Sequence, residues 1–316
     1  MKVLKVFLII IFALILVVGG LILADYLAKG FDLGIFDDAV LEENTYEVST
    51  PFSTLKIDCD VADVEVVSGD SSTVKIETKN REGMGFTHKV EGDTLIINQV
   101  DSRPWYNLFG IYSKRNVVKV YLPASFNGNL AIEDDTGDVK VTGLTLIRCS
   151  IESDTGDITI NNLTALSSEI DSDTGDINAD GIKGGSYDVG AETGNITLKN
   201  VEVETLSLEV ETGDITLENG KLTKKLQIEG ETGEISLKKV YAESLDVKNE
   251  TGDVTFVDLD GYDIKIENDT GDVSGNILTN KIYDIHTSSG DVNFPRPEEG
   301  GGRCYVRTRS GDVEIK

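Results

Sequence analysis

A tripeptide, Thr-Gly-Asp or a close variant, occurs ten times between residues 136 and 312 of this chain. Successive glycines are 19, 19, 19, 19, 20, 19, 19, 19 and 21 residues apart. They are Gly137, Gly156, Gly175, Gly194, Gly213, Gly233, Gly252, Gly271, Gly290 and Gly311. A short fixed period over this length is typical of a solenoid, in which one supersecondary unit stacks on its neighbours.

The hydrophobic pattern within each unit predicts strands. The second residue after every glycine is Ile or Val, from Val139 to Val313, and so are nearly all residues five before it. The residues seven before and four after are mostly apolar, with polar residues between, and this period of two describes strands with one buried face. We therefore predict an all-β fold, a single-stranded β-solenoid (β-helix) of about ten 19-residue rungs over residues 129–316. An aliphatic column seven after the glycine, from Leu144 to Leu278, predicts a corner.

The repeated glycine is expected to lie in a turn between two strands. A positive φ at that position is accessible to glycine and costly for a residue with a Cβ. The flanking Thr and Asp side chains can hydrogen-bond to the turn backbone.

The N-terminus predicts a membrane anchor. Residues 6–24 are apolar and uncharged, long enough for a helix across a bilayer, so a transmembrane helix is expected to precede the solenoid. Lys2 and Lys5 before the span and Asp25 after it predict a cytoplasmic tail at residues 1–5 and an extracytoplasmic C-terminal domain, a single-pass protein of the cell membrane. A cleaved signal peptide is the alternative. Residues 25–45 are expected to form a juxtamembrane spacer, either a helix on the membrane or a plain stalk.

Residues 46–128 predict an irregular β-region that caps the N-terminal end of the solenoid, because bare rung edges invite association. Residues 295–302 are expected to form a loop between the last two rungs.

An aromatic loop within the N-terminal region has two interpretations: it folds over the end of the solenoid as part of the cap, or it contacts a partner or a membrane. Its interaction candidates are Trp105, Tyr106, Phe109 and Tyr112.

Charge limits the partners. The chain has 56 acidic and 29 basic residues and a net charge of −27. We expect no nucleic-acid binding, because such binding needs clustered Lys and Arg. Cations or cationic polymers match this charge better.

Acidic residues recur two before and one after the turn glycine, and stacking is expected to align them into two ladders. Two interpretations stand: the ladders bind Ca²⁺, which prefers carboxylate oxygens, or the acids accept turn N–H bonds and are solvated. No other cofactor is predicted. The candidate metal ligands are Asp154, Asp157, Asp173, Asp176, Glu211, Asp214, Glu250, Asp253, Asp269 and Asp272.

The three cysteines, Cys59, Cys149 and Cys304, are widely spaced and form no metal or redox motif. Two of them occupy the inward column seven before the glycine. We expect them to act as small buried hydrophobic residues.

The rungs have the form (Asp/Glu/Ser)-(Thr/Ser)-Gly-(Asp/Glu/Asn)-(Ile/Val) and follow an apolar N-terminal segment and an irregular β-region. In this the chain resembles the bacterial DUF4097 family. That family is described as adhesin-like and includes LiaG-like and YvlB-like envelope proteins. The resemblance covers residues 46–316. It implies a β-solenoid ectodomain and a role in adhesion or envelope stress, and it assigns no functional residues.

The favoured function is a non-enzymatic, membrane-anchored surface protein that interacts with an envelope protein, a polymer or cations. The alternative is a carbohydrate-active β-helix enzyme of the cell envelope, with paired carboxylates as acid and base. The equivalence of the acids from rung to rung, and the presence of only His88 and His286 as histidines, weigh against a single catalytic centre.

Overall fold

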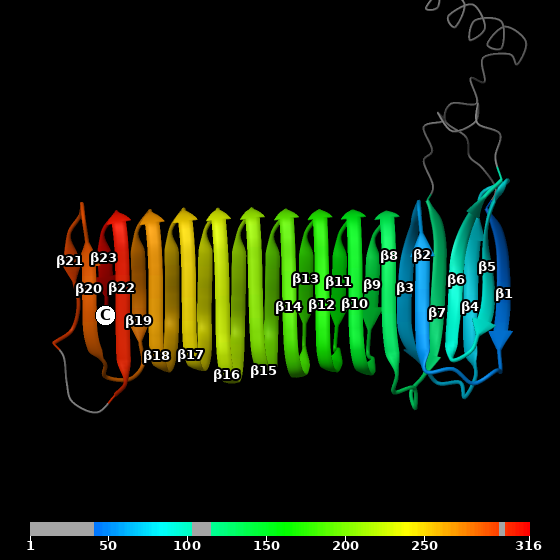
Figure 1. Ribbon diagram of the computed structural model, residues 1–316, viewed down its shortest axis with the longest axis horizontal. Helices are drawn as coiled ribbons and strands as arrows, with labels where there is room; N and C mark the ends of the chain where they lie inside the picture. Colours follow the sequence, from blue (N-terminus) through cyan, green and yellow to red (C-terminus); the bar gives the residue numbers. More distant parts are fainter. Residues whose placement is uncertain (1–40, 103–114, 297–300) are drawn as a thin grey trace, which may run out of the picture. The chain divides into compact units, whose positions relative to one another are not determined.

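The computed structural model describes residues 41–102, 115–296 and 301–316 (Figure 1). Every element in these ranges is a β-strand. Within them no helix has the length and apolar character needed to cross a bilayer, and the predicted span 6–24 lies outside them. Residues 41–101 and 116–316 make up one compact unit, which is described here by itself.

The strands fall into an irregular N-terminal group and a regular series. The first group is β1 (Glu42–Val48), β2 (Thr54–Cys59), β3 (Ala62–Gly69), β4 (Val74–Asn80), β5 (Met84–Glu91), β6 (Thr94–Asp101) and β7 (Asn116–Pro123). The regular series begins with β8 (Asn129–Thr136), β9 (Val139–Thr142), β10 (Thr145–Thr155), β11 (Ile158–Asn161), β12 (Thr164–Thr174), β13 (Ile177–Asp180) and β14 (Lys183–Thr193). It continues with β15 (Ile196–Thr212), β16 (Ile215–Thr232), β17 (Ile235–Thr251), β18 (Val254–Thr270), β19 (Val273–Ile277), β20 (Ile282–Thr287), β21 (Val292–Asn293), β22 (Arg303–Ser310) and β23 (Val313–Ile315).

Each regular rung consists of a long strand, a turn at the glycine and a short strand. Long strands pair in parallel with long strands, and short with short, so that the rungs follow one another in a row (Figure 1). In β15 to β18 one continuous strand turns the corner and supplies both parts. The register keeps equivalent positions together: Ile170 lies between Ile151 and Val189. The predicted all-β solenoid of about ten rungs is confirmed.

The core fills the space between the two rows of strands. In the interior rungs the side chains of the four predicted inward columns are buried; in one rung Leu206, Leu208, Ile215 and Leu217 are each at most 1% exposed. All three cysteines are buried and unpaired. Burial raises the pKa of the Cys149 thiol to about 12, so this residue packs as a neutral hydrophobic group, as predicted.

The turn glycines meet two separate constraints. Gly213 has φ +148°, in the region that side chains rarely adopt, as the sequence predicted. In addition, a Cβ on Gly213 would lie 2.0 Å from the carbonyl oxygen of Gly194 in the preceding rung. The turns therefore stack backbone on backbone, with no room for a side chain.

A second column of left-handed residues forms the corners, six residues after the turn glycine. It includes Asn162, Asn200, Asn219, Lys239 and Asp258, with φ between +53° and +57°. Except at Gly220, the next residue after these five points an aliphatic side chain into the core, for example Leu163, which is fully buried. Leu278 breaks this pattern, contrary to expectation: it is 61% exposed because β19 ends at Ile277 and the chain leaves the stack there.

At the N-terminal end, the rungs are not stacked in sequence order. The rung formed by β2 and β3 lies between the rung of β6 and β7 and the rung of β8 and β9. Antiparallel strands then close this end: β5 pairs with β6, β4 with β7, and β1 with β4. As a result Leu95 and Ile97 of β6 are fully buried.

The C-terminal end has a second change of order, which follows the segment expected to join the last two rungs, residues 295–302. These residues join β21 to β22, but β22 and β23 insert between the rung of β18 and β19 and the rung of β20 and β21. Burial explains this order, because Cys304 and Val306 of β22 become fully buried inside the stack. Lys281, with its side chain 1% exposed, holds the crossing through an ion pair to Asp260 (3.0 Å) and a hydrogen bond to the carbonyl of Gly301 (2.8 Å).

The turn-on-turn contact predicts a large effect of a side chain at Gly213. We expect Gly213→Val to lower the free energy of unfolding by about 3 kcal/mol or more, because the branched side chain meets both a disfavoured φ and the Gly194 carbonyl. Gly85→Val is the matched control, since a Cβ there has no atom within 4 Å and no positive φ. Chemical denaturation of the full chain measures both; equal losses for the two variants would show that the turn requires no glycine.

Candidate functional site

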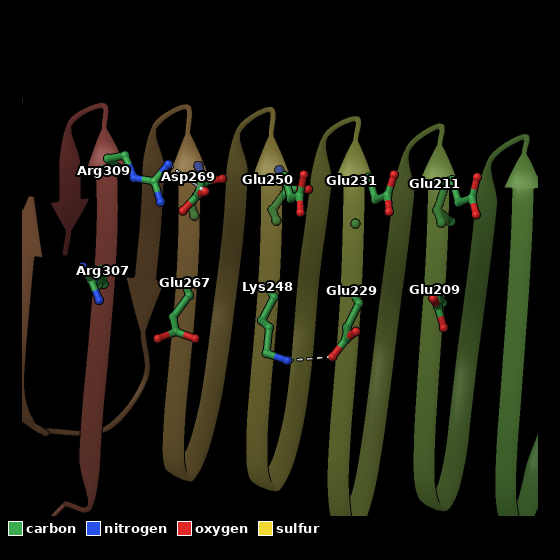
Figure 2. A pocket seen from close by; sticks show the side chains of 14 residues that line it. Glu209, Glu211, Glu229, Glu231, Lys248, Glu250, Glu267, Asp269, Arg307 and Arg309 are labelled. Atoms are coloured by element: carbon green, nitrogen blue, oxygen red, sulfur yellow. Dashed lines mark hydrogen bonds and ion pairs between the residues drawn. The ribbon is translucent and has the colours of Figure 1, made fainter.

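The candidate site lies on the outer face of the long strands of β15 to β18 and β22, where charged side chains line a groove. There a shallow groove of about 390 Å³ runs across neighbouring rungs (Figure 2). Its floor includes Gly230, Asn249 and Asn268, and its walls are side chains two and four residues before the turn glycine. The charged wall residues are Glu209, Glu211, Glu229, Glu231, Lys248, Glu250, Glu267, Asp269, Arg307 and Arg309.

The β17–β22 half of this groove is partly neutralised. Lys248 pairs with Glu229 at 2.8 Å, and Arg309 with Asp269 at 3.2 Å. The hydrogen bond between Lys248 and Glu229 raises the pKa of the lysine and lowers the pKa of the carboxyl group. Figure 2 shows Arg307 and Arg309 at the β22 side of the groove and the glutamates of β15 and β16 at the other.

The opposite side leads into an acidic hollow of about 200 Å³ over Gly190. We define the acidic hollow by its five carboxylates: Asp171, Asp173, Glu192, Glu209 and Glu211. The hollow exists because Gly190 has no side chain; a Cβ there would lie 2.7 Å from Asp171 Oδ1. No ion pair to any of the five occurs in the described part of the chain.

The pKa of Asp171 reflects the negative charge of the acidic hollow. Burial, and then the nearby charges of Glu169, Asp188, Glu152 and Glu209, raise the pKa of its carboxyl group to about 6. A raised carboxyl pKa of this kind marks a place where negative charge lacks compensation, and where a cation would be stabilised.

Five of the predicted metal ligands form a hydrogen-bonded ladder along the turns. They are Asp157, Asp176, Asp214, Asp253 and Asp272, each one residue after its glycine. Each accepts a hydrogen bond from the backbone N–H of the equivalent residue in the neighbouring rung, at 2.8–2.9 Å. Asn195 takes the same place in the column: its Oδ1 accepts from the Asp214 N–H at 2.8 Å. These side chains link the rungs, which is the second of the two interpretations of the ladders.

The other five predicted ligands lie two residues before the glycine, exposed on the outer face. Asp173 and Glu211 belong to the acidic hollow, and Glu250 and Asp269 to the wall of the groove, while Asp154 precedes them along the same column. Among residues that the structure describes, no group of three or more His, Cys, Asp or Glu side chains is arranged to hold a metal ion. Calcium binding by the ten acids stays a prediction.

The aromatic candidates Trp105, Tyr106, Phe109 and Tyr112 lie outside the described residues, so both interpretations of that loop stay open. The segment joins β6 to β7, where other rungs have a short turn. Beside this point, Gln99 Oε1 accepts from the N–H groups of Asp60 and Val61 at 2.9 and 2.7 Å and so holds the adjacent turn of β2 and β3.

The acidic hollow itself was missed by sequence reasoning. One of its members, Asp171, lies four before a turn glycine, in a column that also contains Gly190, Lys248 and Arg307 and therefore has no uniform charge. The available signal was local: acids alternate along β12 and return in β15, with a glycine between them in β14.

These features define the class of the protein: it is an acidic β-solenoid with two rows of strands around an apolar core. The family model described as Toastrack DUF4097 matches residues 52–238 and 222–316. The chain belongs to the DUF4097 family, as its repeats implied. A search of the curated proteins finds no match.

Solved structures show distant similarity. A Bacteroides fragilis protein described as a "putative adhesin" is 14% identical, with 90% of this chain and 100% of that chain covered and a TM-score of 0.44. A Parabacteroides distasonis protein described as a "putative lipid binding protein" is 15% identical, with coverages of 89% and 100% and a TM-score of 0.46. A Clostridium sporogenes protein described as a "putative cell adhesion protein" is 10% identical, with coverages of 87% and 99% and a TM-score of 0.26.

The turn ladder predicts a graded response at Asp214, whose Oδ1 accepts from the Glu234 N–H at 2.8 Å. Asp214→Ala removes the acceptor and is expected to cost about 1–2 kcal/mol of unfolding free energy. Asp214→Asn keeps an oxygen in place, as Asn195 does, and is expected to stay within about 0.5 kcal/mol of the parent. Chemical denaturation of the three chains compares them. An equal loss in both variants would show that the charge, and not the acceptor, matters.

Proposed function

We propose that this protein is a non-enzymatic surface protein, anchored in the cell membrane by residues 6–24, whose extracytoplasmic solenoid binds a cationic partner through the acidic hollow. The partner is a basic segment of an envelope protein or a cationic envelope polymer. The observation that carries the proposal is the set of five uncompensated carboxylates around Gly190.

The geometry suits a polyvalent, extended ligand. The hollow is shallow and continues into the groove across parallel strands, so a chain with positive charges at intervals can lie along it. Charge attraction of this kind steers association and sets specificity more than it adds affinity. The enzymatic alternative gains no support, because the outward acids recur in equivalent positions and nothing in the described chain singles out one pair.

A cationic probe tests the hollow. We expect a fluorescent pentalysine peptide to bind the full chain, held in a nonionic detergent, and to bind more tightly as the pH rises from 5 to 7, because Asp171 loses its proton near pH 6. The double variant Glu192→Gln/Glu211→Gln should weaken binding about fivefold or more, because two charges at contact distance are lost.

The matched control neutralises two exposed acids of the N-terminal region, Glu42→Gln/Glu82→Gln, and should leave the affinity within about twofold, since charges beyond roughly 10 Å are screened. Equal weakening in both double variants would show that only net charge matters and would refute the hollow as a site.

The same titration with CaCl₂ tests the calcium hypothesis. A larger signal with Ca²⁺ than with NaCl at matched ionic strength would support calcium binding.

Location is tested separately. Protease added to intact cells should degrade the solenoid, and washing membranes at alkaline pH should leave the chain in the membrane fraction. Protection from protease would contradict the topology, and release by alkali would contradict the anchor.

A further inference from the structure

The outermost rung at the C-terminal end of the solenoid, formed by β20 and β21, is incompletely buried. Its inward side chains include Val292, 39% exposed, and Phe294, 38% exposed, which packs on the half-buried Tyr283 with 5.7 Å between ring centroids. The equivalent residues of an interior rung, Val254 and Phe256, are at most 1% exposed. This end of the core is therefore open.

The strand edges at this end are open as well. Among the described strands, β20 pairs only with β22, and β21 only with β23. At the opposite end the outermost strands, β1 and β5, run antiparallel to the strands with which they pair. The pairing of β5 with β6 shows that the parallel stack of this chain accepts an antiparallel strand at its edge.

We propose that β20 and β21 are a docking surface for a second copy of this chain, and that two solenoids associate end to end about a twofold axis normal to their sheets. Rotation about such an axis reverses the strand direction and returns each sheet to itself. It therefore places β20 antiparallel to β20 of the second copy and β21 antiparallel to its own counterpart, and the interface is closed and isologous. This inference does not depend on the proposed function.

Backbone geometry selects the register. Ile282 N–H donates to Gly302 and Ser288 N–H donates to Thr308, so the even-numbered residues of β20 bond toward β22. In a parallel pair the N–H and C=O of alternate residues point to opposite sides, which leaves those of Tyr283, Ile285 and Thr287 facing the open edge. A register centred on Ile285 pairs Ile285 with itself and Tyr283 with Thr287 of the second copy, so that all three contribute hydrogen bonds.

Side-chain complementarity selects the same register. Asp284 and His286 point outward, each 65% exposed, and their side chains bond to each other at 2.7 Å within β20. Because a histidine ring can donate to a carboxylate whether or not it is charged, the two side chains are complementary as donor and acceptor. Centred on Ile285, Asp284 lies opposite His286 of the second copy, twice by symmetry. A register centred on Asp284 would instead place two carboxylates opposite each other, which is destabilising. Because the chain has a net charge of −27, side-by-side association of the acidic faces is disfavoured, while the end rung offers apolar side chains and a self-complementary pattern of donor and acceptor side chains.

Disulfide trapping in the full chain, purified in detergent, tests the register. Differently tagged Asp284→Cys and His286→Cys chains are mixed and oxidised. Opposite residues of a non-hydrogen-bonded antiparallel pair have Cα atoms about 4.5 Å apart, within reach of a disulfide. We expect a linked heterodimer in the mixture, at least about fivefold more than in either variant alone, and the native cysteines do not compete because they are buried.

The control mixes Asp188→Cys with His286→Cys, because exposed Asp188 holds the position of Asp284 in a rung in the middle of the solenoid. Linkage in the control equal to that in the test mixture would reflect collision and overturn the proposal. Linkage of Asp284→Cys with itself, in preference to the mixture, would also overturn it.

A charge exchange provides a second readout that leaves the core unchanged. Asp284→Lys should lower the dimer fraction at fixed concentration about fivefold, and Asp284→Lys/His286→Asp should restore it. Asp188→Lys should leave it unchanged. A monomeric parent chain, or a dimer equally insensitive to all three variants, would contradict the end-to-end interface.

Discussion

The contact on which this structure depends is the stacking of one turn backbone on the next. At Gly213 a Cβ would fall 2.0 Å from the carbonyl oxygen of Gly194, and the same contact repeats along the glycine column. Because no side chain separates the turns, neighbouring turns are held at strand spacing in one register. The inward columns are thereby superimposed into a continuous core, and the outward columns into rows of like side chains.

That regularity shapes what the surface can do. An aligned column of acids would repel itself, and the turn aspartates offset the repulsion by accepting N–H groups of the next rung, as at Asp157 and Asp176. The distinctive places are those where a column changes residue type. Gly190 opens the acidic hollow, and Lys248 and Arg309 neutralise the neighbouring groove. Function in a fold of this kind depends on departures from the repeat.

The repeat itself was readable from the sequence, because a period of two and an obligatory glycine are local signals. The strands, the buried columns and the positive φ of the turn glycines followed from them. The corner residues Asn162, Asn200 and Asn219 were missed, although Asn is a residue type that adopts left-handed backbone.

The order of the end rungs could not be predicted from the sequence, because each rung has the same hydrophobic pattern and could stack beside any other. The choice of β22 over β20 as neighbour of β18 depends on tertiary burial around Cys304 and Lys281. Asp171 was missed for a related reason, since its raised pKa arises from burial and from charged neighbours in three other strands as well as its own.

The stacking order is the most direct test of this account, and outward residues report it. Glu267 is paired with Arg307, and Arg307 with His286, whereas stacking in sequence order would place Glu267 beside His286. Cysteine pairs in the full chain, mapped by mass spectrometry after mild oxidation, distinguish the two orders, with His286→Cys/Arg307→Cys as a pair that links in either. The account predicts a disulfide in Glu267→Cys/Arg307→Cys and none in Glu267→Cys/His286→Cys; a disulfide in the second and none in the first would contradict it.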